Sequence, residues 1–144
     1  IQCALGIIQL KKIDKFVNRR IAIAKKYDEA FKNVDGVLIP YQEAYGKSSW
    51  HLYVIKLDLN KFTTGRKEIF KELKDEGIGV NVHYIPVYYF PYYKQLGYKK
   101  GICPKAEELY EGIITLPLFP AMKDEEVDRV IQSVCSIIER YKKY

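Results

Sequence analysis

The chain has 144 residues, 48% hydrophobic and 29% charged, which is typical of one globular domain with a genuine core. It holds no run of about 18 apolar residues, so we expect no membrane-spanning helix. The start, Ile1-Gln2-Cys3, lacks both a secretory leader and an initiator methionine. We therefore expect a cytoplasmic protein, and a chain that is a piece of something longer.

The net charge of +6 raises the question of an acidic partner. Lysines alternate with acids in stretches such as KEIFKELKDEG, which is typical of a solvated helix surface rather than a nucleic-acid-binding face. A basic rim would still favour a small anionic substrate. Three scattered cysteines and two histidines lack the spacing of a zinc site, so we predict no metal and reduced thiols.

The first half of the chain predicts a helical region followed by two strands. Residues 3–33 predict one long helix or two in succession, ended by Asp35-Gly36. Residues 37–40 predict a short strand, and residues 50–58, rich in aromatic and β-branched residues, predict a second. The helical region carries an apolar stripe at three- and four-residue steps: Ile13, Phe16, Val17, Ile21, Ala24 and Phe31.

The second half continues with alternating elements. Residues 65–77 predict a helix stopped by Gly77, and residues 78–85 a strand with Val80, Val82 and Ile85 facing inward. Pro86 and Pro91 predict irregular backbone. A short helix opened by Pro104, an extended apolar segment (113–120) and a long amphipathic helix from Asp124 complete the chain. The pattern predicts an α+β fold, with helices packed on a small, mostly antiparallel sheet.

The stretch VNVHYIPVYYFPYY, residues 80–93, is the most unusual in the chain. It fits three structures: a packed core, an aromatic platform for nucleic acid, or the wall of a substrate pocket. The prolines break any stacking platform, which argues against nucleic acid. Single histidines such as His51 and His83 are more often hydrogen-bonded structure than ligands, and the tyrosines Tyr84 and Tyr88 more often pack in a core or interface. No glycine-rich phosphate loop, nucleophile elbow or metal-binding histidine pair occurs.

Several motifs together resemble one family. IQCALGIIQLKKIDKFVNRRIAIAKKYDEAF, WHLYVI, GIGVNVHYIPVYYFPYYKQLGY, KAEELY and ITLPLFPAMKDEEVDRVI are similar, in this order, to the C-terminal region of the DegT/StrS family of sugar aminotransferases. These are pyridoxal phosphate enzymes of the aspartate-aminotransferase fold that act on nucleotide-linked keto sugars. Within the family the pattern most resembles transaminases that aminate C4 of a UDP-linked 4-keto-6-deoxy-N-acetylhexosamine, in pseudaminic acid, spore-coat or surface-polysaccharide synthesis.

The resemblance implies a division of the chain and a set of roles. It implies a linking helix (1–34) before the small C-terminal domain (35–144), homodimeric assembly, and glutamate as the amino donor. The Schiff-base lysine and the other cofactor contacts of the family lie upstream, so we expect no catalytic or cofactor-binding residue here, and no activity or bound pyridoxal phosphate in this chain alone. His83, Tyr84 and Tyr88, with His51 beside them, are predicted to face the sugar nucleotide and orient it. Relatives often have a second histidine in place of Tyr88, which leaves the sugar preference open. The alternative is a non-catalytic module that binds sugar nucleotides or another protein.

Overall fold

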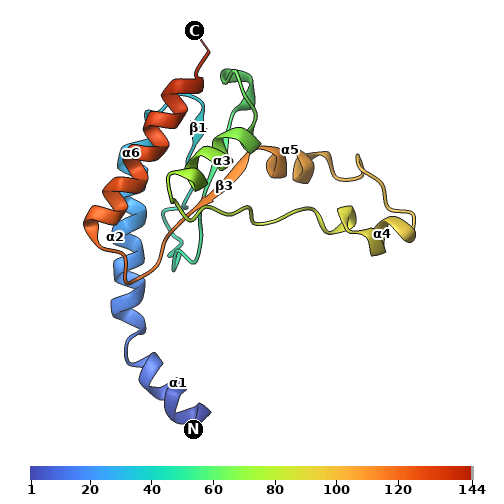
Figure 1. Ribbon diagram of the computed structural model, residues 1–144. Coiled ribbons are helices and arrows are strands. Elements are labelled where there is room, and N and C mark those ends of the chain that lie inside the picture. The colour runs from blue at the N-terminus through green and yellow to red at the C-terminus, as the bar shows by residue number, and fades with distance from the viewer. Residues whose placement is uncertain (144) are drawn as a thin grey trace.

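A three-stranded antiparallel sheet lies at the centre of the computed structural model, which describes residues 1–143. The strands are β1 (Val37–Leu38), β2 (Tyr53–Leu57) and β3 (Ile113–Leu116), in the spatial order β1-β2-β3 (Figure 1). The pairing of β2 with β3 runs from Tyr53 opposite Leu116 to Lys56 opposite Ile113. The sheet therefore brings the start of β2 next to the end of β3.

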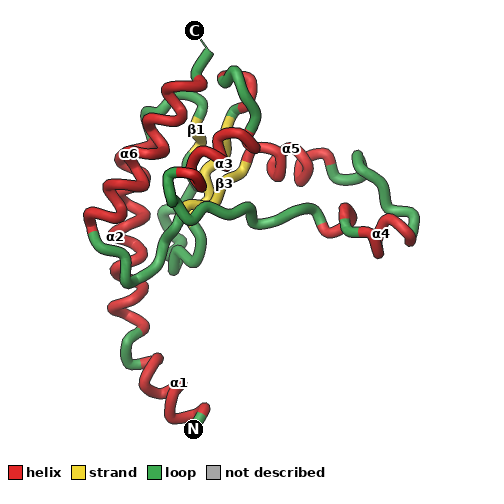
Figure 2. The backbone as a smooth tube through the Cα atoms, in the orientation of Figure 1, coloured by secondary structure: helices red, strands yellow, loops and turns green. Residues whose placement is uncertain are grey.

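Helices surround this sheet and make up most of the regular structure (Figure 2). The predicted α+β architecture is confirmed, and the helical region at the start of the chain consists of two helices. In the described part of the chain the α-helices are α1 (Gln2–Leu10), α2 (Ile13–Phe31), α3 (Arg66–Asp75), α4 (Pro91–Gln95), α5 (Pro104–Gly112) and α6 (Asp124–Tyr141), with 3-10 turns η1 (Leu59–Lys61) and η2 (Val87–Tyr89).

One face of the sheet carries the core. Alternate residues of β2, namely Tyr53, Ile55 and Leu57, are buried, while those between them are half-buried. Helix α6 contacts both α2 and α3 and supplies a buried stripe at helical spacing: Val127, Val130, Val134, Ile137 and Ile138. Each such apolar side chain stabilises the fold by about 1.5–3 kcal/mol relative to an exposed one.

Polar contacts fix α2 against this core. Tyr27 of α2 donates its hydroxyl hydrogen to the carbonyl oxygen of Pro117 (2.8 Å), and Tyr53 donates to the carboxylate of Asp28 (2.7 Å). Arg19 reaches Asp124 at the start of α6 (3.0 Å). The second half of α2 is thus part of the packed body.

Two segments extend away from the body. Every residue of α1 is exposed, including the apolar Leu5, Ile7, Ile8 and Leu10. The second segment, residues 86–103, holds η2 and α4 and stands out on the other side of the molecule (Figure 1). We call residues 86–103 the arm. Between α1–α2 and the arm the molecule has a concave side.

The strand predicted for residues 78–85 is wrong. These residues form a single antiparallel bridge, in which Asn81 and Thr115 exchange backbone hydrogen bonds of 2.8 and 3.1 Å. The next amide, that of Val82, donates to the side-chain oxygen of Asn81 (2.8 Å). Val80 is buried as predicted, whereas Val82 and Ile85 are half-buried. The helix stop at Gly77 is confirmed, with φ of +79°.

No helix in residues 1–143 combines the length and the apolar character that crossing a bilayer requires.

Candidate functional site

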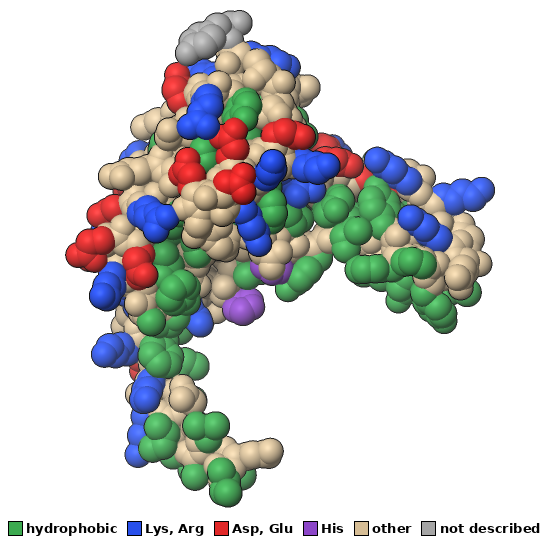
Figure 3. All heavy atoms as spheres, in the orientation of Figure 1, with side chains coloured by type: hydrophobic (Ala, Val, Ile, Leu, Met, Phe, Trp, Pro, Cys, Tyr) green, Lys and Arg blue, Asp and Glu red, His purple; other side chains and the backbone are tan. Residues whose placement is uncertain are grey.

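Both histidines of the chain lie on the concave side (Figure 3). His83 follows the bridge between Asn81 and Thr115, and His51 precedes β2. The antiparallel register places the start of β2 near the end of β3, where Thr115 lies. Two histidines that are 32 residues apart in the sequence thus lie toward the same side of the molecule.

His83 is held by hydrogen bonds at both ring nitrogens. Its Nδ1 lies 2.9 Å from the hydroxyl oxygen of Thr115, and its Nε2 lies 3.3 Å from the side-chain nitrogen of Asn81. The side-chain oxygen of Asn81 accepts from the Val82 amide, so the amide nitrogen of Asn81 must face the ring.

This arrangement determines the tautomer of His83. The Asn81 amide nitrogen can only donate, so Nε2 of His83 accepts, and the ring proton lies on Nδ1, from which it is donated to Thr115. The ring is thereby held in one orientation. Because its nitrogens are engaged by the protein, it offers neighbours mainly its face and carbon edge.

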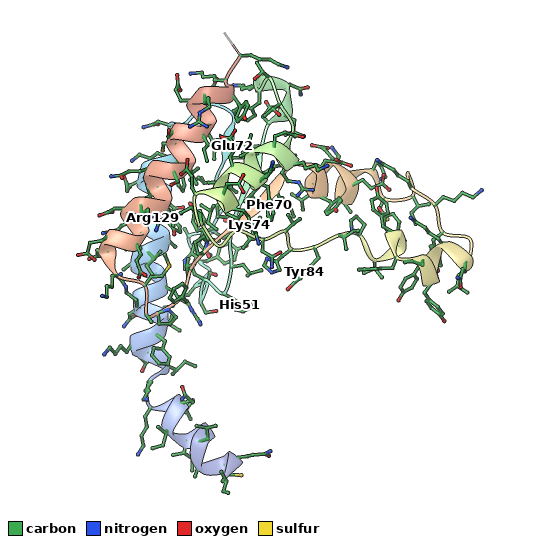
Figure 4. The ribbon with its side chains drawn as sticks, in the orientation of Figure 1. His51, Phe70, Glu72, Lys74, Tyr84 and Arg129 are labelled. Atoms are coloured by element: carbon green, nitrogen blue, oxygen red, sulfur yellow. The ribbon has the colours of Figure 1, made fainter. Side chains whose placement is uncertain are left out.

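Tyr84 is the exposed partner of this histidine. Its ring meets the His83 ring edge-on, with centroids 4.5 Å apart and planes at 78°. Its side chain is 70% exposed, and Figure 4 shows it projecting from the body on the concave side. An aromatic ring held by its neighbour, with a free hydroxyl, is suited to contact a sugar or a base by stacking and hydrogen bonding.

His51 is presented from the adjacent loop. It follows Trp50, which has a φ of +50° and donates its amide hydrogen to the Ser48 hydroxyl (3.0 Å). The Trp50 ring packs against Tyr53, with centroids 5.6 Å apart. The anchored Trp50 leaves His51 exposed, and Figure 4 places His51 on the same side as Tyr84.

Tyr88 differs from the other predicted site residues. Its hydroxyl donates to the carboxylate of Glu107 at 2.8 Å. Burial, together with the hydrogen bond to this carboxylate and its charge, raises the pKa of Tyr88. The structure therefore brings His83, Tyr84 and His51 to one side and engages the Tyr88 hydroxyl inside the protein.

Glu107 is a buried carboxylate of α5 that the sequence did not single out. It is 7% exposed and accepts from Tyr88 and from the Gly101 amide (2.6 Å). Burial alone would raise the pKa of Glu107, but these hydrogen bonds outweigh it and hold the pKa below its usual value. Nothing in the sequence KAEELY distinguishes Glu107 from the exposed Glu108. The sequence analysis also did not identify Thr115 and Asn81 as the residues that hold His83.

Neither the lysines of the described chain nor a surface hollow beside β2 is our choice for the candidate site. No lysine within residues 1–143 is buried, and the half-buried Lys56 pairs with Glu108 at 2.7 Å. A hollow of about 450 Å³ lies between β2, η1 and α5, lined by residues that include Leu57 and Gly112. It is at the end of β2 opposite to His51. We place the candidate site at the His83–Tyr84 pair because an oriented ring and an exposed aromatic group lie together there.

Comparison with known proteins gives one consistent result. The model of the DegT/DnrJ/EryC1/StrS aminotransferase family matches residues 1–135. The chain is 43% identical to the spore coat polysaccharide biosynthesis protein SpsC of Bacillus subtilis, over 96% of this chain and 36% of that protein. It is 39% identical to a UDP-4-amino-4,6-dideoxy-N-acetyl-beta-L-altrosamine transaminase of Campylobacter jejuni, over 99% and 38%. The chain spans little more than a third of the length of these curated relatives.

Solved structures agree with the sequence relatives. Helicobacter pylori PseC, an aminotransferase involved in the biosynthesis of pseudoaminic acid, superposes with a TM-score of 0.89 at 34% identity, covering 97% of this chain and 37% of that chain. The PLP form of a Streptococcus pneumoniae protein, Spr1654, assigned as a sugar aminotransferase, gives a TM-score of 0.85 at 33% identity over 94% and 34%. The fold predicted from the sequence, the small C-terminal domain of such enzymes, is confirmed.

Proposed function

The chain belongs to the DegT/DnrJ/EryC1/StrS aminotransferase family, and we propose that it is the C-terminal part of a pyridoxal phosphate-dependent sugar-nucleotide aminotransferase. The reaction is the amination of C4 of a nucleotide-linked 4-keto-6-deoxy sugar, derived from a UDP-N-acetylhexosamine, with glutamate as donor. The product would serve nonulosonic acid or surface-polysaccharide synthesis in the cytoplasm. The names of the Bacillus and Campylobacter relatives support this choice of substrate class.

We propose that residues 1–143 do not form a cofactor site by themselves. A cofactor lysine needs a sheltered position, but every lysine of the described chain lies at least partly in solvent. When bound to the longer enzyme, pyridoxal phosphate would supply the electron sink of transamination. We propose that the groups holding it lie outside this chain, and that this chain supplies the sugar side of the site.

The observation that carries the proposal is the oriented His83–Tyr84 pair. Asn81 and Thr115 fix the His83 ring, and His83 in turn supports the exposed ring of Tyr84. Together with His51, these side chains form a wall that can orient a nucleotide sugar by stacking and by hydrogen bonds from the Tyr84 hydroxyl. The role is positioning of the substrate and exclusion of water, without proton transfer by these residues.

The two extended segments support a proposal about assembly. The exposed apolar residues of α1, such as Leu5 and Ile8, and those of the arm, such as Phe90 and Leu96, need partners in a stable protein. We propose that residues 1–34 link the small domain (35–144) to the rest of the enzyme, and that the arm and α1 contact the remainder of a homodimer. The boundary at residue 34 follows the end of α2 at Phe31.

A transamination assay tests the proposal. Purified enzyme containing this chain is incubated with pyridoxal phosphate, glutamate and a panel of UDP- and dTDP-linked 4-keto sugars, and 4-amino products are detected by mass spectrometry. We expect product from a UDP-linked substrate, and a higher KM in the Tyr84→Ala variant with kcat retained. Absence of product from every sugar would refute the proposal.

The second candidate is a non-catalytic module that binds sugar nucleotides. For the chain in isolation it is favoured because every lysine in residues 1–143 is at least partly exposed, so none has the sheltered position that a cofactor lysine needs. In both cases the chain alone should stay colourless with added pyridoxal phosphate. The enzyme that contains it should be yellow. A colourless, inactive enzyme that binds UDP-sugars would identify the module instead.

A further inference from the structure

The arm is joined to α5 by one buried carboxylate, that of Glu107, and by an exposed ion pair between Lys100 and Glu111 (3.5 Å). Oε1 of Glu107 accepts a hydrogen bond from the Tyr88 hydroxyl (2.8 Å) and another from the Gly101 amide (2.6 Å). Tyr88 lies near the start of the arm and Gly101 near its end. A single oxygen atom of α5 therefore holds both ends of an 18-residue segment whose middle stands away from the body.

These hydrogen bonds are strong contacts for the arm. The acceptor is ionised and 7% exposed, so water competes poorly with its two donors. Gly101 has a φ of +99°, a conformation that favours glycine and that turns the chain back toward Glu107. Aromatic packing adds to the attachment, because Tyr89 meets Tyr110 of α5 edge-on at 6.1 Å.

We propose that Glu107 is a positioning residue for the sugar-nucleotide site. It fixes the two ends of the arm on α5. Tyr84 lies four residues before Tyr88, so the attachment limits where the backbone that leads from Tyr84 into the arm can lie. This inference rests on the proposed function, in which Tyr84 faces the nucleotide sugar. It assigns a role to a residue that does not itself contact substrate.

The same contact redefines the part played by Tyr88. Its hydroxyl hydrogen is donated to Glu107, so the hydroxyl cannot also donate a hydrogen bond to a sugar. Tyr88 attaches the arm through this hydrogen bond.

Three variants separate these roles. Glu107→Ala removes the acceptor, whereas Glu107→Gln keeps an Oε1 that can accept from both donors without the charge. The neighbouring Glu108→Ala removes ion pairs of an exposed carboxylate with Lys56 and Lys105, neither of which involves the arm, and is the control. Amide hydrogen exchange by NMR is measured on each variant, and KM and kcat for the nucleotide sugar are measured in the enzyme that contains the chain.

In Glu107→Ala we expect the Gly101 amide to exchange at least about tenfold faster, as loss of a hydrogen bond to a charged group implies. The amides of β2 should be unchanged. KM for the sugar nucleotide should rise by about tenfold with kcat retained, and Glu107→Gln should recover part of both effects.

Two results would overturn the inference: exchange in Glu107→Ala that matches Glu108→Ala, or faster exchange with an unchanged KM. A wild-type enzyme without turnover would overturn the proposed function and the substrate role with it. The exchange data, which need no substrate, would then still decide whether Glu107 holds the arm.

Discussion

The support of His83 by Thr115 leads to a prediction about one hydroxyl group. Thr115→Val keeps the branched shape of a side chain that is 4% exposed and removes the oxygen 2.9 Å from Nδ1 of His83. The backbone bridge between Thr115 and Asn81 is retained, so the change is confined to the side-chain contact.

The expected cost follows from the geometry. A neutral hydrogen bond contributes about 0.5–1.5 kcal/mol to stability, and the half-buried His83 can partly recover its bond with water, so we expect the lower part of this range. For a chain of this size the melting temperature should fall by about 2–4 °C. Thr115→Ser, which keeps the hydroxyl, separates loss of the hydrogen bond from loss of the methyl group.

Nitrogen-15 NMR of the imidazole ring measures directly which ring nitrogen of His83 carries the proton. The wild-type protein should show His83 protonated on Nδ1 and unprotonated on Nε2. In Thr115→Val the preference for Nδ1 should weaken, because its acceptor is gone, while Thr115→Ser should resemble the wild type. A wild-type ring protonated on Nε2 would refute the tautomer assignment and the reasoning based on Asn81.

Three further predictions concern the frame of the site. Tyr53→Phe removes the hydroxyl that donates to Asp28, and urea unfolding should show a loss of about 1.5–3 kcal/mol because the acceptor is charged. Gly112→Ala would place a Cβ 2.8 Å from the carbonyl oxygen of Leu57, and overpacking should cost about 1–3 kcal/mol in the same assay. The pKa of Glu107 is lowered in the folded protein, so its contribution to stability is present at neutral pH and is lost as the pH falls below about 4.3 and through the folded pKa. Glu107→Gln should therefore show a smaller fall in urea midpoint between neutral and acidic pH.

Each of these predictions has a matched control. Tyr41→Phe removes an exposed hydroxyl bonded to Glu43, and it should leave the free energy of unfolding nearly unchanged. Gly79→Ala meets no atom within 4 Å and should be tolerated. An equal loss in Tyr53→Phe and Tyr41→Phe, or in the two glycine variants, would contradict the reasoning. An equal fall in urea midpoint between neutral and acidic pH in Glu107→Gln and in the wild type would contradict the reasoning about the pKa of Glu107.

The fold followed from the sequence wherever a repeating pattern was present. The stripe of α6 and the alternation of β2 were readable because burial on one face imposes a helical or strand period. Residues 78–85 have the composition of a strand, but in the described chain they pair with β3 only through the Asn81–Thr115 bridge, and composition does not reveal how far such pairing extends. The predicted strand was therefore wrong although Val80 was correctly placed in the core.

The candidate site could be predicted only in part. His83 and Tyr84 were found through family motifs, and the structure places them side by side. That prediction of substrate contact stays a prediction. Tyr88 was assigned to the pocket wall by the same family resemblance, and in the structure its hydroxyl donates to Glu107. Glu107 was not predicted as a site residue, because an acidic residue on a short charged helix is usually exposed. Its burial depends on the tertiary fold.

The most direct test of the account is a crystal structure of the enzyme that contains this chain, bound to its UDP-linked 4-amino sugar product. We predict that the sugar or nucleotide contacts Tyr84 and the ring of His83 on the concave side, while the Tyr88 hydroxyl stays on Glu107. A product bound elsewhere, with the His83–Tyr84 pair in contact only with protein, would contradict the account.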